Sequence, residues 1–151
     1  MIEEIAAKHP AVQLAAAVGE PDAYAGELPL LFAVLKPGAR ASEREILDFL
    51  AARIHERPAL PKRAVFLDAM PLTALGKIYK PALRRIATER RIAEALAPLA
   101  VDGVALRVEG VEAGGAISVR IHVSGADHAR IEAKIAKLLR DYAVEPEIVW
   151  G

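Results

Sequence analysis

The sequence predicts an α+β protein: a small antiparallel or mixed sheet flanked by helices, followed by a C-terminal β–β–α–β extension. Short apolar runs between glycine and proline residues are typical of strands, and they alternate with segments of helical periodicity. Near the C-terminus, alternating apolar and polar residues indicate strands with one buried face. The pattern changes at residues 98–103, so we expect two domains, 1–98 and 99–151.

The N-terminal region predicts a helix followed by two strands. The helix covers residues 2–8 and is ended by Pro10, because proline disfavours helical conformation in the residue before it. Apolar runs at residues 11–18 and 28–35 have the length and the boundaries of buried strands. Residues 19–22, Gly-Glu-Pro-Asp, predict the turn between them.

The middle of the chain predicts two helices separated by a strand and a loop. Ser42 and Glu45 have the spacing of a capping box, and the helix that they start is ended by Pro58. Pro81 suits the first turn of the second helix, where its missing N–H costs nothing. The expected elements are a helix from residue 42, a strand over 63–67, a loop over 68–80 and a helix over 81–97 with Leu83, Ile86, Ile92 and Leu96 in the core.

The last third predicts the β–β–α–β extension. Alternation predicts strands over residues 104–108 and 117–123, joined by a turn at Gly114-Gly115. An amphipathic helix over residues 126–142 and a strand over 145–150 complete it. The expected apolar stripe of the helix consists of Ile131, Ile135, Leu138, Leu139 and Tyr142.

Composition excludes several classes of function. Lys plus Arg and Asp plus Glu both total 20, and aromatic residues make up 5%, which disfavours a nucleic-acid-binding protein. The chain has no cysteine, which excludes disulfides and zinc ribbons and fits a cytoplasmic location. We expect no membrane span, since no apolar run approaches about 20 residues. We expect no metal site, because His9, His55, His122 and His128 lack ligand spacing with carboxylates.

The most informative segment is Pro-Leu-Thr-Ala-Leu-Gly-Lys-Ile at residues 71–78. Taken alone it predicts a solvated turn with one lysine, Lys77, at its tip. It is not a phosphate-binding P-loop, because Lys77 is followed by Ile78 rather than Ser or Thr.

Five segments, in order, resemble the C-terminal domain of the adenylate-forming superfamily, which includes acyl-CoA synthetases, nonribosomal-peptide adenylation domains and luciferases. Each segment alone is weak, but their common order over roughly residues 2–90 makes the resemblance specific. Some bacterial fatty-acyl-CoA synthetases carry a comparable extension, which favours that branch over a peptide-synthetase module. The segments are residues 2–5 with 9–12, 17–22 with 26–27, 30–36, 61–62 with the strand after them, and 71–78.

The resemblance implies a two-step reaction, in which a carboxylate and ATP give an acyl-adenylate, and CoA then gives the thioester and AMP. ATP and CoA are the expected substrates, with Mg²⁺ accompanying ATP through an N-terminal adenylation domain that this chain lacks. The C-terminal domain rotates between the steps. The chain alone is therefore expected to be inactive.

The resemblance assigns adenylation to Lys77, and physical chemistry fits that role. A cation on a long stem offsets the repulsion between an anionic carboxylate and an anionic phosphate as they meet. Gly76 allows the backbone to approach a partner closely. We expect contacts with ATP, acyl-adenylate or CoA from Gly76, Thr73, Gly26, Glu27, Lys80 and Arg84.

Two departures from the family pattern stand beside the motif: Lys80 occupies a position that is often Arg, and Leu75 one that is often small. A basic cluster at the start of the second helix is either a solvated face or a surface that attracts the phosphates of CoA or an acidic patch on the missing domain. Its residues are Lys77, Lys80, Arg84, Arg85, Arg90 and Arg91. Acylation of Lys77 would remove the charge that adenylation needs.

Two other functions stay open. The chain is alternatively a standalone, non-catalytic module that acts in trans on a truncated synthetase or as an interaction domain. A ligand-sensing regulatory domain is a third reading, supported only by the β–β–α–β tail.

Overall fold

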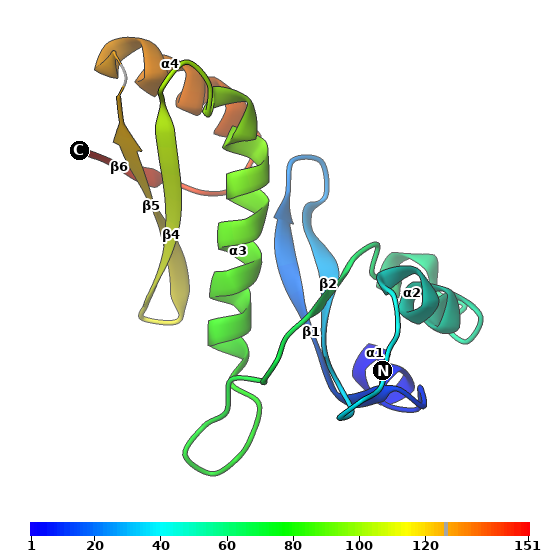
Figure 1. Cartoon of the computed structure of the whole chain (residues 1–151). Coiled ribbons are helices and arrows are strands. Elements are labelled where there is room, and N and C mark those ends of the chain that lie inside the picture. The colour runs from blue at the N-terminus through cyan, green and yellow to red at the C-terminus, as the bar shows by residue number, and fades with distance from the viewer. Residues whose placement is uncertain (126) are drawn as a thin grey trace. The chain divides into compact units, whose positions relative to one another are not determined.

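The computed structural model describes residues 1–125 and 127–151 and confirms the α+β class (Figure 1). The chain divides into two compact units. The first unit comprises Met1–Gly19 with Leu28–Leu83, and the second comprises Glu20–Glu27 with Arg84–Gly151. The elements are α1 (Ile2–Ala6), β1 (Val12–Asp22), β2 (Gly26–Leu35), α2 (Glu43–Ala51), a 3-10 turn (Arg57–Ala59), β3 (Ala64–Phe66), α3 (Lys80–Leu96), a second 3-10 turn (Ala97–Leu99), β4 (Ala105–Ala113), β5 (Ala116–Ser124), α4 (His128–Leu139) and β6 (Pro146–Trp150).

The first sheet has the strand order β1-β2-β3, and β2 and β3 run parallel. The core beside it is built mainly from small and branched apolar side chains, with α2 contributing Ile46 and Leu50. The predicted helix cap is confirmed, because Ser42 Oγ accepts the Glu45 amide at 3.1 Å. Glu43 Oε2 accepts the Ala64 amide at 3.0 Å and so ties α2 to β3.

The predicted turn at residues 19–22 is wrong, because β1 continues through Asp22. Proline is tolerated at position 21 because β1 is an edge strand, where a missing N–H breaks no ladder. The turn follows at residues 23–25, where Asp22 Oδ2 accepts the amides of Tyr24 and Ala25 at 2.9 and 2.8 Å. Gly26 ends it with φ +79°.

The second sheet has the order β4-β5-β6, antiparallel in the first pair and parallel in the second. With α4 between β5 and β6, it confirms the predicted β–β–α–β order, and Gly114 and Gly115 form the turn, as expected. Residue 126, the expected start of the helix, lies outside the described residues. The core comprises Ile92, Leu96, Leu99, Val119, Ile121, Val123, Ile131, Ile135 and Leu139.

Two expected core positions differ from the structure. Leu138 is 37% exposed, since it lies at the margin of the stripe formed by Ile131, Ile135 and Leu139. On α3, Ile86 is only half-buried, whereas Leu83, Ile92 and Leu96 are buried as predicted, together with Ala87 and Thr88.

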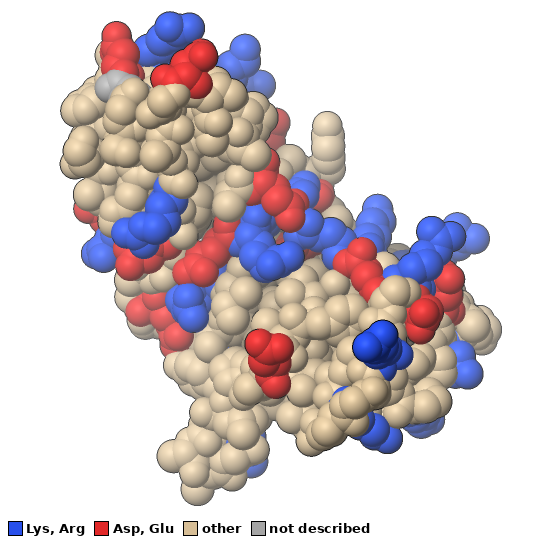
Figure 2. All heavy atoms as spheres, viewed as in Figure 1, with Lys and Arg blue, Asp and Glu red and all other residues tan. Residues whose placement is uncertain are grey.

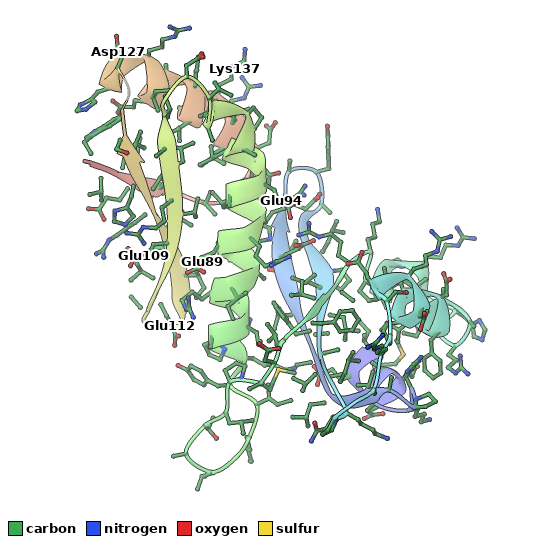
Figure 3. The ribbon with its side chains drawn as sticks, in the orientation of Figure 1. Glu89, Glu94, Glu109, Glu112, Asp127 and Lys137 are labelled. Atoms are coloured by element: carbon green, nitrogen blue, oxygen red, sulfur yellow. The ribbon has the colours of Figure 1, made fainter. Side chains whose placement is uncertain are left out.

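A carboxylate of α3 covers the free edge of β4. Glu89 Oε1 accepts the Gly110 amide at 2.9 Å and the Arg85 guanidinium at 2.8 Å (Figure 3 labels Glu89). A β-carbon added at Gly110 would lie 2.8 Å from Arg85 Cγ and 3.2 Å from the Arg85 carbonyl oxygen. Glycine is therefore required for this close approach, and the edge strand is protected from pairing with other chains.

The helix α3 contributes residues to both units, since the division falls between Leu83 and Arg84. The domain boundary at residue 98 stays a prediction. Across the described residues, no helix has the length and apolar character that membrane crossing requires. Residues 1–125 and 127–151 also contain no group of three or more His, Asp or Glu arranged to hold a metal ion.

Candidate functional site

The loop before α3 is a closed, hydrogen-bonded structure rather than an irregular connection. Its base is closed by the Tyr79 amide, which donates to the Pro71 carbonyl at 2.8 Å, and by an antiparallel bridge between Leu72 and Ile78. These contacts make residues 71–79 a narrow projection of the first unit, which Figure 1 shows just before α3.

Thr73 holds the tip of this loop through three hydrogen bonds. Its amide donates to the Lys77 carbonyl at 2.7 Å, and its Oγ1 accepts the Lys77 amide at 3.2 Å. Its carbonyl accepts the Gly76 amide at 2.9 Å. Gly76 has φ +82°, a left-handed conformation that favours glycine, although a β-carbon there would meet nothing within 4 Å. The sequence thus fixes the loop locally, by a short polar side chain and a glycine.

The Lys77 side chain extends from this fixed backbone into solvent. It is exposed, and within residues 1–125 and 127–151 its ammonium forms no ion pair with a carboxylate. It is also the single charged residue of segment 71–79. Figure 2 shows the visible face of the loop, at the lower left, as mostly uncharged surface. The hydrogen-bonded loop thus carries one positive charge, and the Lys77 ammonium is accessible to an anion on another molecule or domain.

Lys80, by contrast, is engaged within the first unit. Its Nζ donates to Glu3 Oε1 at 2.6 Å, and the same oxygen accepts the Ala17 amide at 3.2 Å. Burial raises the pKa of Glu3, but the hydrogen bonds from Lys80 and Ala17 outweigh it and lower that pKa below its ordinary value. Lys80 at the start of α3 is thereby linked to α1 and β1.

The other expected contact residues belong to the second unit. Gly26 and Glu27 are exposed at the start of β2, and Arg84 is exposed on α3. The structure thus gathers Thr73, Gly76 and Lys77 in one loop with Lys80 at its base.

The basic cluster of α3 is paired only in part. Arg85 binds Glu89, while Arg91 Nη2 lies 3.8 Å from Asp22 and Arg91 Nη1 lies 3.5 Å from Glu94. Arg84 and Arg90 point into solvent. The cluster is therefore in part a structural network, which the sequence alone does not show.

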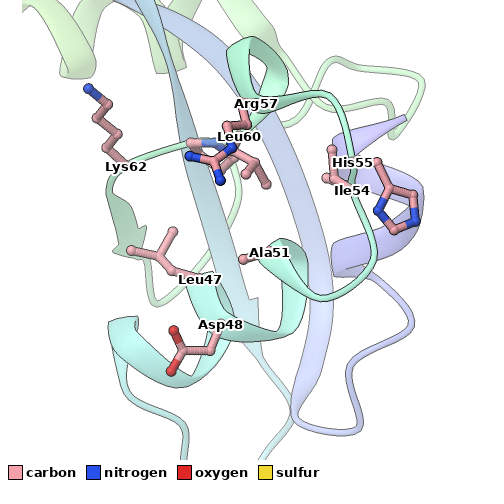
Figure 4. Close-up of a pocket in the computed structure, with 9 residues that line it drawn as sticks. Leu47, Asp48, Ala51, Ile54, His55, Arg57, Leu60 and Lys62 are labelled. Atoms are coloured by element: carbon pink, nitrogen blue, oxygen red, sulfur yellow. The ribbon is translucent and has the colours of Figure 1, made fainter.

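The first unit also contains a depression of about 680 Å³ beside the C-terminal half of α2 (Figure 4). Its walls are apolar, and its rim carries exposed Arg57, Lys62 and His55. The carboxylate on the rim, Asp48, lies 3.4 Å from the exposed Arg44. Two cations against one partnered carboxylate give the depression a positive balance, suited to an anion that carries an apolar or aromatic group.

Sequence reasoning did not assign a role to this depression or to Glu3. Lys62 stood within a recognised segment, but the proximity of Arg57 to it depends on the turn at Arg57–Ala59. Glu3 also stood within a recognised segment, residues 2–5, but nothing in the sequence indicated its partner. Its partner lies 77 residues away, a separation that no local pattern reveals.

Comparison with known proteins identifies the class. The profile of the family described as AMP-binding enzyme C-terminal domain matches residues 1–77, which is half of the chain and ends at Lys77. The chain belongs to this family of C-terminal domains of adenylate-forming enzymes.

Several of its relatives are CoA ligases. It is 32% identical over 143 residues to the marinolic acid–CoA ligase of Pseudoalteromonas sp. (strain SANK 73390), a match over 93% of this chain but 21% of that protein. A Mycobacterium tuberculosis fatty acyl CoA synthetase matches with a TM-score of 0.51 and 34% identity over 55% of this chain and 16% of that one. The anthranilate CoA ligase AuaEII in complex with anthranoyl-AMP matches with a TM-score of 0.54 and 33% identity, covering 60% and 18%. The chain therefore spans about a fifth of such proteins, as expected for a C-terminal domain.

Proposed function

We propose that this chain is the mobile C-terminal domain of an acyl-CoA synthetase and that Lys77 serves the adenylation step. The observation that carries the proposal is the exposed ammonium of Lys77 on a hydrogen-bonded loop, without an ion pair among the described residues. The family match and the CoA-ligase relatives support it. An adenylation domain is the proposed partner.

The proposed reaction has two displacements. In the first, a carboxylate oxygen forms a bond to the α-phosphorus of ATP, the bond from that phosphorus to the bridging oxygen breaks, and pyrophosphate leaves. In the second, CoA sulfur forms a bond to the acyl carbon, the bond to the AMP oxygen breaks, and the thiol proton is released. Lys77 acts in the first, because its charge opposes the repulsion of two anions and binds the charge that develops between them.

The rest of the loop serves to deliver that charge. Thr73 fixes the backbone on both sides of the tip, and Gly76 keeps the surface beside Lys77 free of a side chain. A fixed support lowers the entropy lost when the ammonium meets the reacting groups. Mg²⁺ belongs with ATP in the adenylation domain, and we place the activity in the cytoplasm, in fatty acid metabolism.

For the second step, we assign CoA recognition to exposed polar groups. The depression with Arg57 and Lys62 at its rim suits the phosphates and the adenine ring of CoA. Gly26, Glu27 and Arg84 remain proposed CoA or nucleotide contacts in the second unit. The exposed main-chain groups at Gly26 and the exposed guanidinium of Arg84 can donate hydrogen bonds to the phosphates of CoA or of a nucleotide.

The experiment measures pyrophosphate release in the synthetase that carries this chain, with ATP and a series of fatty acids. Lys77→Ala is expected to lower the rate about 10²–10³-fold, the usual effect of removing one charge-stabilising donor. Lys36→Ala, at another exposed loop lysine, is the matched control and should leave the rate unchanged. The isolated chain should release no pyrophosphate. An unchanged rate in Lys77→Ala contradicts the assignment.

A further inference from the structure

The loop that carries Lys77 is attached to the first unit at a defined point. The two chain ends of the loop meet at the bond from the Tyr79 amide to the Pro71 carbonyl, and Lys80 follows at once as the first residue of α3. Because the loop is closed on itself by its own hydrogen bonds, its direction depends on how this base is held. The contact of the Lys80 side chain at the base is its bond to Glu3.

Glu3 is well placed to hold that base. Its carboxylate joins three elements, since it belongs to α1, accepts the Ala17 amide of β1 and accepts Lys80 Nζ of α3. The distance of 2.6 Å to Lys80 is that of a short, charge-assisted hydrogen bond. These contacts lie within the first unit.

Electrostatics explain why this lysine needs a carboxylate. A cation at the N-terminus of a helix is repelled by the positive end of the helix dipole, and the first turn of α3 contains no acidic residue. Glu3 supplies the missing negative charge from a distant part of the sequence. The side chains of Lys80 and Glu3 are 43% and 34% exposed, so the pair contributes orientation more than stability.

We propose that Glu3 and Lys80 are positioning residues, whose ion pair fixes the direction in which the loop presents Lys77. The proposal rests on the proposed function of Lys77. It gives Lys80 a role different from contact with a nucleotide, because its ammonium is directed to a carboxylate of its own unit. A displacement of about 1 Å at a reacting group can reduce a rate about 100-fold, so loss of the pair should slow adenylation without removing it.

The test uses Glu3→Gln, which still accepts the Ala17 amide, and Lys80→Met, which retains the length of the stem. Both variants are expected to lower the adenylation rate about tenfold while leaving the KM for ATP unchanged. Conversion of supplied acyl-adenylate to thioester should also be unchanged. Lys80→Arg, which keeps charge and reach, should retain most of the rate. Arg120→Met, which breaks the exposed pair with Glu147 on the second sheet, is the matched control.

The outcomes are separable. If Lys80→Met raises the KM for ATP while Glu3→Gln keeps the full rate, Lys80 binds the nucleotide and the proposal is overturned. If both half-reactions fall together with the melting temperature, the pair is merely structural and the proposal is also overturned. If Lys77→Ala slows adenylation but neither pair variant does, only the positioning role fails. If Lys77→Ala has no effect, both proposals fail.

Discussion

The second sheet and the loop of residues 71–79 use polar side chains differently. On the second sheet, side chains pair across strands: Arg120 lies 3.2 Å from Glu147 on β6, and His122 Nε2 lies 3.0 Å from Glu109 on β4. In the first unit, the loop of residues 71–79 presents one charge that its own unit leaves without a carboxylate. The comparison separates side chains that tie strands together from Lys77, whose charge a hydrogen-bonded loop supports without pairing it.

The similarity to known proteins differs along the chain. The family profile ends at residue 77, whereas the match to the marinolic acid–CoA ligase covers 93% of the chain. The profile covers most of the first unit together with residues 20–27 of the second, and the match to the marinolic acid–CoA ligase reaches into the β–β–α–β extension. The comparison therefore predicts that substitutions in the core of the extension affect stability, and that substitutions in the loop affect adenylation.

The largest expected effect on stability lies in the second core. Ile135 is 1% exposed, and Ile135→Ala should lower the free energy of unfolding by about 2–5 kcal/mol through lost transfer energy and a cavity. Urea unfolding of the 151-residue chain measures this. The adenylation rate at a temperature where the variant remains folded should match that of the parent. A lower adenylation rate in the folded variant would contradict the idea that this core serves stability alone.

The covered edge of β4 gives the next effect. Glu89→Ala leaves the Gly110 amide without its acceptor, which should cost about 1–3 kcal/mol in the free energy of unfolding. Gly110→Ala should destabilise as well, because its β-carbon meets Arg85 at 2.8 Å. Arg120→Met, which breaks a more exposed pair on the same sheet, serves as the control. It should lower the free energy of unfolding by less than about 1 kcal/mol, because exposed ion pairs contribute little to stability.

A third prediction sharpens the comparison within the first unit. Gly76 and Gly38 both have positive φ, +82° and +75°, and a β-carbon meets nothing within 4 Å at either. Alanine at each position should therefore cost about 1–2 kcal/mol of backbone strain. Only Gly76→Ala should also lower the adenylation rate, because it changes the backbone and the surface beside Lys77. Equal rates in the two variants would contradict a specific role for the loop tip.

The smallest effect is on the acid dependence of stability. Because the pKa of Glu3 is lowered in the folded chain, its contribution is complete above its ordinary pKa of 4.5 and is lost as pH falls through the lower folded value. Glu3→Gln should therefore be less stable than the parent at pH 7, and the difference should shrink as pH falls below 4.5 and vanish below the lower folded pKa. Urea midpoints over this range measure it. Glu109, whose pKa the His122 hydrogen bond lowers, should behave in the same sense in the second unit.

Much of the fold was predictable because its signals are local. Ser42 caps a helix, Gly114 and Gly115 turn a hairpin, and alternation marks β4 and β5. The turn predicted at residues 19–22 was wrong because a strand tolerates proline when it lies at the edge of its sheet. Whether a strand lies at an edge is a property of the assembled fold and not of the local sequence.

The site was predictable only in part for the same physical reason. The loop of Lys77 is closed by hydrogen bonds over at most eight residues, so a sequence motif can specify it. The pair of Glu3 and Lys80 and the cover of Gly110 by Glu89 join residues that are distant in sequence. Such contacts depend on packing, and they became visible only in the structure.

The most direct measurement compares the two half-reactions in one Lys77→Ala preparation of the synthetase. The rate of acyl-adenylate formation should fall by orders of magnitude, whereas conversion of supplied acyl-adenylate and CoA to thioester should keep the parent rate. Equal losses in the two half-reactions, or full adenylation without the Lys77 ammonium, would contradict the role proposed for this loop.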